Sequence, residues 1–225
     1  MVIPSATSFL TNAGDAGFLL PVTIVSSAMF WRFHSRQLAW ILLRSVGLAA
    51  VLIVALKMIF LSCGTQWQTG IQSPSGHACM SAAVYGCLAT VVAAARAPRA
   101  RAAVGALIVV LVGAIAASRV LLGVHTLAEV LIGLAIGAGA QQLFAWSYAR
   151  MEPLQVNART FGVAFAVTVL LAFGLRIPAE SALRHVARRV GASCAADGPH
   201  PLPALLRYPS ERSNAATSSA SSRAL

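Results

Sequence analysis

Four short groups of polar residues interrupt an otherwise apolar chain, and their chemical types suit the binding and transfer of a phosphate group. They are Lys57, the tetrapeptide Pro74-Ser75-Gly76-His77, the pair Ser118-Arg119, and the pair His125 and Glu129. Lys and Arg supply positive charge, and Arg can bind two oxygens of one anion at once. Two histidines can divide a covalent reaction, one attacking phosphorus and the other protonating the leaving oxygen.

The spacing of these residues adds two further features. Ser75 and Gly76 stand just before an apolar run, which predicts a helix N-terminus whose free backbone N–H groups attract a phosphate. His125 and Glu129 are four residues apart and therefore share one face of a helix. A glutamate that accepts a hydrogen bond from a histidine fixes its tautomer and raises its basicity.

Each group taken singly also has a plain structural explanation. Lys57 could extend its amine to the membrane surface, and Ser75 could simply cap a helix. Arg119 could anchor a helix end, and His125 with Glu129 could form a buried structural pair. Because all four groups are predicted on the same side of a membrane, their coincidence favours an anion-binding site.

At this point the chain resembles the type 2 phosphatidic-acid phosphatase superfamily. That family carries the blocks Lys-x6-Arg-Pro, Pro-Ser-Gly-His and Ser-Arg-x5-His-x3-Asp. Residues 74–77 match the second block fully, and residues 118–129 match the third except that Glu129 replaces Asp. Lys57 matches the start of the first block, but Gly64-Thr65 stands where the family has Arg-Pro. The resemblance covers roughly residues 50–145.

The resemblance implies a role for each matching position. His125 is implied as the nucleophile that forms a phosphohistidine, His77 as the general acid, and Glu129 as the residue that orients His125. The implied phosphate cradle has four members: Lys57, Ser75, Gly76 and Arg119. No metal and no other cofactor are implied. Without the first-block Arg, either activity is weaker or another group takes its place.

Three functions follow as hypotheses. The first is a membrane phosphatase that hydrolyses a lipid phosphomonoester or lipid pyrophosphate whose tail lies among the helices. The second is a membrane protein that binds a lipid phosphate without hydrolysing it, and Gly64 is its best support. The third is a small structural or transport helix bundle whose polar residues merely pack.

The elements that position these residues must be membrane-spanning helices. Of 225 residues, 58% are hydrophobic and only 10% are charged, and the mean hydropathy is +0.76. Soluble domains carry about 25% charged residues, so a soluble globule is excluded. A spanning helix needs about 20 apolar residues. The sequence therefore predicts an all-α, polytopic membrane helix bundle of about six transmembrane helices, at residues 16–31, 37–62, 78–95, 102–117, 126–148 and 160–175.

The predicted organisation has four parts. They are an N-terminal segment at 1–15, the six-helix membrane domain at 16–177, an interfacial helix at 178–190 and a disordered tail at 191–225. Gly133 and Gly137 have the spacing of a close helix contact, either within one chain or at a dimer face. The oligomeric state stays open.

The net charge of +11 comes from arginines that lie mostly in short gaps between apolar runs. This distribution is typical of membrane topology, so we expect it to orient the chain in the membrane and expect no nucleic-acid partner. Basic loops face the cytoplasm, which places the four polar groups on the outer side. For a bacterial inner membrane, the site then faces the periplasm. The Arg-containing tail opposes this orientation, although long segments obey the rule less strictly.

Overall fold

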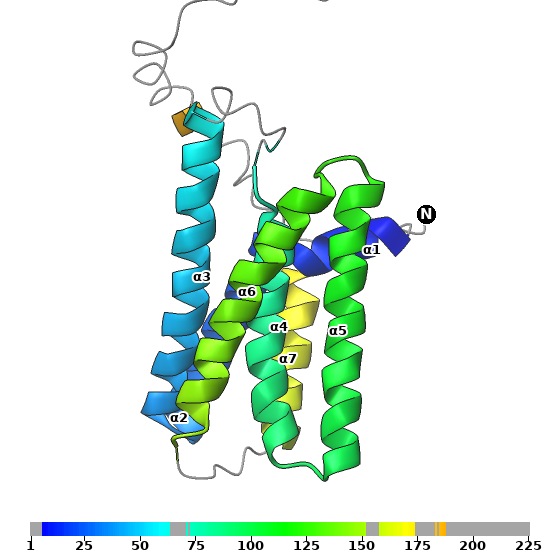
Figure 1. Cartoon of the computed structure of the whole chain (residues 1–225). Coiled ribbons are helices and arrows are strands. Elements are labelled where there is room, and N and C mark those ends of the chain that lie inside the picture. The colour runs from blue at the N-terminus through cyan, green and yellow to red at the C-terminus, as the bar shows by residue number, and fades with distance from the viewer. Residues whose placement is uncertain are drawn as a thin grey trace, which may run out of the picture.

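The computed structural model describes residues 6–63, 71, 73–151, 158–173, 183 and 185–187, and its elements are α-helices (Figure 1). In chain order they are α1 (Ala6–Gly14), α2 (Ala16–Phe33), α3 (Arg36–Cys63), α4 (Gly76–Ala94), α5 (Pro98–Leu121), α6 (Leu127–Tyr148) and α7 (Ala158–Ala172). Among the described residues, five helices are long and apolar enough to cross a membrane, namely α2 to α6. The predicted all-α membrane helix bundle is confirmed.

The sixth predicted span, at 160–175, corresponds to α7. With 15 residues, α7 is about 22 Å long, which is shorter than the hydrocarbon core of about 30 Å. It packs against α2, and the ring of Phe173 lies 5.5 Å from that of Phe18. α7 is therefore part of the bundle. The predicted interfacial helix at 178–190 is described at four residues, which are helical, and the predicted tail lies outside the described residues.

α4 is the helix against which most of the others pack. It contacts α1, α2, α3, α5 and α6, and α5 and α6 flank it in Figure 1. Its buried positions include small residues such as Ala78, Cys79 and Ala83. Inside a bilayer, helices associate through close packing rather than through burial from water, so small side chains favour this central position.

α6 crosses α4 at close range because glycines face the contact. An added Cβ at Gly133 would collide with the carbonyl oxygen of Ser75, and one at Gly137 would collide with that of Cys79. The glycine pair thus packs within one chain. This contact brings the N-terminal end of α4 against the first turns of α6.

Polar caps fix where three of the helices begin. Asp15 caps α2 and accepts a 2.7 Å hydrogen bond from the Gly17 N–H, while Ser75 caps α4 by accepting from the Ala78 N–H. Thr126 begins α6 with a capping box that Glu129 completes. Since α2, α4 and α6 begin at the end of the bundle where α3 and α5 finish, all these caps lie together.

The segment 1–15 contains a helix that the sequence analysis does not predict. α1 lies across the same end of the bundle and contacts α2, α4 and α5 (Figure 1). The Tyr85 hydroxyl donates a 2.7 Å hydrogen bond to the Ala13 carbonyl, and Gly14 has Ile115 of α5 beside it. These contacts hold α1 against the membrane helices.

The close contact of α4 with α6 generates a stability prediction. Gly137→Ala should lower the free energy of unfolding by about 1–3 kcal/mol, because the added methyl would push the two helices apart. The measurement is thermal or denaturant unfolding of the purified chain in detergent. Gly139→Ala is the matched control, since nothing lies within 4 Å of its added Cβ and alanine favours a helix over glycine. Equal destabilisation by both variants would contradict the interpretation.

Candidate active site

The four predicted groups meet at one end of the bundle (Figure 1). Lys57 lies near the end of α3, and residues 73–75 lead into α4. Arg119 is in the last turn of α5, and His125 precedes the start of α6. Two helix ends and two helix starts therefore surround one small volume.

The Glu129 carboxylate connects the segment before α4 with the turn before α6, and the residue is only 3% exposed. Its Oε2 accepts hydrogen bonds from His125 Nδ1 at 2.9 Å and from the Thr126 N–H at 3.0 Å. Its Oε1 accepts a 2.9 Å bond from the Ser73 N–H, and its backbone carbonyl accepts from the Ser75 N–H at 3.0 Å. A buried carboxylate is costly unless it is hydrogen-bonded, and these donors supply that compensation.

The bond to Glu129 also defines which nitrogen of His125 can react. A carboxylate acceptor keeps the imidazole proton on Nδ1, so the lone pair is on Nε2. The glutamate, where the family motif has aspartate, keeps the negative charge. Its length lets Oε2 close the capping box with Thr126 while Oε1 reaches Ser73.

Lys57 points into the bundle rather than toward the membrane surface. It is 5% exposed, and its Nζ donates a 2.9 Å hydrogen bond to Ser73 Oγ. A Cβ on Gly76 would lie 3.4 Å from the Lys57 Cε, so Gly76 lets this side chain lie against the first turn of α4. The ammonium therefore adds a full charge to the positive end of the α4 dipole.

The turn between α5 and α6 brings Arg119 and His125 together. Gly123 has φ of +65°, a left-handed conformation that glycine adopts without strain. The N–H groups of Val124 and His125 both donate to the Arg119 carbonyl, at 3.2 and 3.3 Å. The Gly123 N–H donates to Val120 at 2.9 Å, which completes a Schellman helix end. The five residues between Arg119 and His125 are thus the last two residues of α5 and the turn that follows it.

Two contacts from the N-terminal segment were not predicted from the sequence. Arg119 Nη1 donates to Thr11 Oγ1 of α1 at 3.4 Å. Asp15 Oδ2 lies 3.7 Å from His77 Nε2, within ion-pair range of a protonated imidazole. Asp15 precedes an apolar run and is recognisable in the sequence as a helix cap. Its approach to His77 is not recognisable, because it depends on α1 folding back over the bundle.

Ser75 is the remaining predicted site residue, and Gly64 is the predicted departure from the family motif. Ser75 is fully buried and acts as the cap of α4, so its structural explanation holds. Gly64 and Thr65, where the family has Arg-Pro, lie outside the described residues. Within the part of the chain that the structure describes, no three His, Cys, Asp or Glu side chains gather as metal ligands.

The site thus contains two imidazoles, each with a carboxylate partner, beside two cationic side chains and a helix N-terminus. His125 pairs with Glu129 and His77 with Asp15, while Lys57 is the buried cation at the start of α4. Such an arrangement can bind an anion, supply one imidazole as nucleophile or base, and supply a second imidazole for proton transfer. These three capacities suit phosphoryl transfer.

Comparison with known proteins agrees with this geometry. Residues 38–152 match the PAP2 superfamily. An "uncharacterized 22.5 kDa protein in cps region" of Klebsiella pneumoniae is 30% identical over 188 residues, which cover 79% of this chain and 88% of that relative. No solved structure matches the chain. The resemblance seen in the motifs is confirmed, and it supports a phosphatase-type function. The chain is therefore an integral membrane protein that belongs to the PAP2 superfamily.

Proposed function

We propose that the chain hydrolyses a lipid phosphomonoester or a lipid pyrophosphate. The observation that carries the proposal is the 2.9 Å hydrogen bond between His125 and Glu129, at a membrane-helix end that also holds Lys57 and Arg119. A lipid phosphate suits this position because its charged head lies at the membrane interface while its tail stays in the bilayer. The lipid tail then lies beside the apolar helices.

The proposed reaction has two steps. His125 Nε2 attacks phosphorus, so that a P–N bond forms and the bond to the leaving oxygen breaks as His77 donates its proton to that oxygen. Water then attacks phosphorus, His77 takes a proton from the water, and the P–N bond breaks to release phosphate. Lys57, Arg119 and the N-terminus of α4 stabilise the phosphoryl oxygens, and no metal ion is used in this scheme.

A second candidate function rests on Gly64. The residue stands where the family places an arginine, so one charge-assisted contact to the phosphoryl group is missing. Loss of a comparable transition-state contact lowers kcat by about 10²–10³-fold. The second candidate is therefore a membrane protein that binds a lipid phosphate without hydrolysing it.

The first prediction from the proposed reaction tests His125 as the nucleophile. His125→Ala should abolish phosphate release from a panel of lipid phosphates in mixed micelles, because the covalent intermediate can no longer form. Wild-type release should be inhibited by vanadate, an analogue of the phosphoryl transition state. His34→Ala is the matched control, since His34 is the cap at the opposite end of α2. Near-normal turnover in His125→Ala would overturn the mechanism. Binding without turnover in the wild type would instead favour the second candidate.

The second prediction tests Asp15 as a positioning residue for His77. His77→Ala should lower kcat by about 10²–10⁴-fold on a lipid phosphate and far less on p-nitrophenyl phosphate, whose leaving group scarcely needs a proton. Asp15→Asn should show the same dependence on leaving group with a smaller loss, about ten-fold on the lipid phosphate, because the neutral amide no longer stabilises the imidazolium.

Asparagine is the appropriate substitution because it also caps helices well, so the start of α2 is preserved. The readouts are kcat for both substrates and the unfolding temperature. Equal losses of Asp15→Asn on both substrates would show that Asp15 does not act through His77.

The third prediction concerns orientation. In this proposal the site faces the periplasm of a bacterial inner membrane, since the opposite end of the bundle carries arginines at or beside its helix ends: Arg32, Arg36, Arg96, Arg99 and Arg150. A reporter enzyme that is active only outside the cytoplasm should give a signal when inserted between residues 64 and 70. The same reporter should be silent after Arg99. The reverse pattern would place the site in the cytoplasm.

A further inference from the structure

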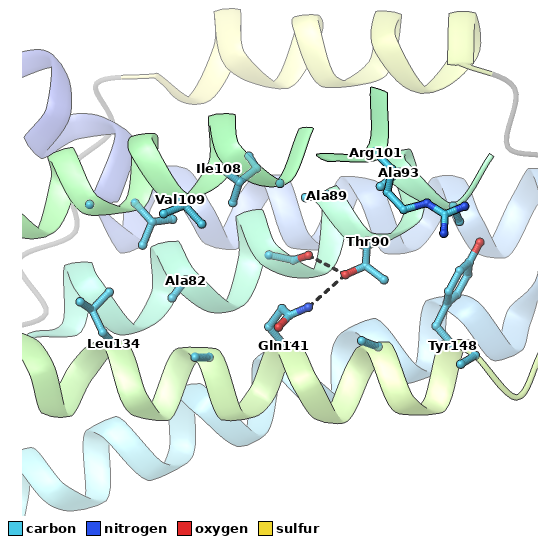
Figure 2. A pocket seen from close by; sticks show the side chains of 18 residues that line it. Ala82, Ala89, Thr90, Ala93, Arg101, Ile108, Val109, Leu134, Gln141 and Tyr148 are labelled. Carbon is cyan, nitrogen blue, oxygen red and sulfur yellow. Dashed lines mark hydrogen bonds between the residues drawn. The ribbon is translucent and has the colours of Figure 1, made fainter. Parts of the chain in front are cut away.

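A groove with a volume of about 800 Å³ runs between α4, α5 and α6, separate from the site described above (Figure 2). Its floor is one face of α4, built from small side chains such as Ala82, Gly86 and Ala89. Its walls include Val109 of α5 and Ala138 of α6, both exposed on the outside of the bundle. The groove therefore opens onto the surface that faces lipid.

The polar side chains inside the groove are hydrogen-bonded within the protein. Gln141 Nε2 donates to Thr90 Oγ1 at 3.2 Å, and Thr90 donates to the Gly86 carbonyl at 2.9 Å (Figure 2). These polar groups bind one another along the floor. Apart from Arg101 and Tyr148 at one end, the rest of the lining is Gly or aliphatic, so a hydrocarbon chain suits the space.

One end of the groove is polar and charged. Arg101 and Tyr148 lie together at this end, whereas Ala82 and Leu134 lie at the other (Figure 2). Arg150, which directly follows the lining residue Ala149 but does not itself line the groove, stacks on the ring of Trp146. Arginine and tryptophan at one level mark a membrane interface. The groove thus begins at the interface opposite the candidate active site and ends in the membrane interior.

The length of the groove matches one leaflet. From Arg101 to Gly113 along α5 is 12 residues, or about 18 Å of helix. Half of a hydrocarbon core of about 30 Å is about 15 Å. A lipid of that leaflet can therefore place its phosphate at Arg101 and one acyl chain along the groove.

We propose that this groove binds an anionic phospholipid of the leaflet opposite the candidate active site, with the phosphate on Arg101 and an acyl chain between α5 and α6. The site does not depend on the proposed hydrolysis. The bound lipid fills the gap beside α4 that α5 and α6 leave, and so completes the packing of the bundle.

The test is lipid retention by the full chain. The purified protein is delipidated in detergent, titrated with phosphatidylglycerol and observed by native mass spectrometry. The wild type should retain one lipid molecule. Arg101→Gln should weaken retention by about five-fold or more, as expected for one basic residue at an anionic head group. Gly113→Leu should abolish retention, because nothing lies within 4 Å of the added Cβ and the larger side chain extends into the groove.

Two matched controls accompany these variants. Arg99→Gln removes a neighbouring exposed charge that does not line the groove, and Gly139→Leu adds the same bulk to α6 outside it. Both should retain the lipid as the wild type does. Gly105→Leu, also in open space along the groove, repeats the Gly113 test if that variant unfolds.

Three results would overturn the proposal. The first is retention that is equal in the wild type, Arg101→Gln and the groove-filling glycine variants. The second is a change of oligomeric state in the glycine variants by light scattering, which would assign this face to a second copy of the chain. The third is loss of lipid-phosphate substrate binding in Gly113→Leu with Arg101→Gln unaffected, which would assign the groove to the substrate's tail.

Discussion

The burial of the Glu129 carboxylate is the constraint that organises this end of the bundle. A carboxylate that is almost fully buried needs several donors, and those donors come from two separate stretches of chain: Ser73 before α4, and His125 with Thr126 in the turn that leads into α6. Satisfying one charge therefore fixes the position of His125, the path of residues 73–75 and, through Ser73, the Lys57 ammonium. The same group that orients the candidate nucleophile also holds a candidate phosphate ligand in place.

This constraint operates only because α4 and α6 approach closely. The hydrogen bond from the Ser75 N–H to the Glu129 carbonyl requires two helix starts to touch, and Gly133 has no side chain to prevent it. In a membrane, such contacts replace the hydrophobic driving force that packs a soluble core. The glycines of α6 are thus as much a part of the site's geometry as the polar residues are, although they carry no side chain.

The two ends of the bundle serve different chemistry. At one end, the cations Lys57 and Arg119 lie near the buried Glu129 carboxylate and a helix N-terminus, an environment suited to a phosphoryl group. At the other end, arginines and tryptophans lie at the membrane surface, and Arg150 stacks on Trp146. The groove between α5 and α6 begins at this second end. The chain thus has cationic groups at both ends of the bundle: Lys57 is buried and Arg119 half-buried at one end, and Arg101 is exposed at the other.

The sequence by itself determined the helical membrane class, most helix positions and the motif residues, because apolar run length and residue spacing are local properties. The spacing predicted His125 and Glu129 on one face of a helix; the two side chains do contact each other, but His125 precedes α6 and bonds to the glutamate that completes the capping box of that helix. Tertiary structure decided the rest. From the sequence alone, the Lys57 amine could extend to the membrane surface. In the structure it donates a hydrogen bond to Ser73, just before α4, inside the bundle. α1 and the pairing of Asp15 with His77 were not foreseen, since no local pattern encodes which distant segments a short helix folds back upon. Contacts between remote segments form only when the whole bundle packs. The pair of Asp15 and His77 is such a contact.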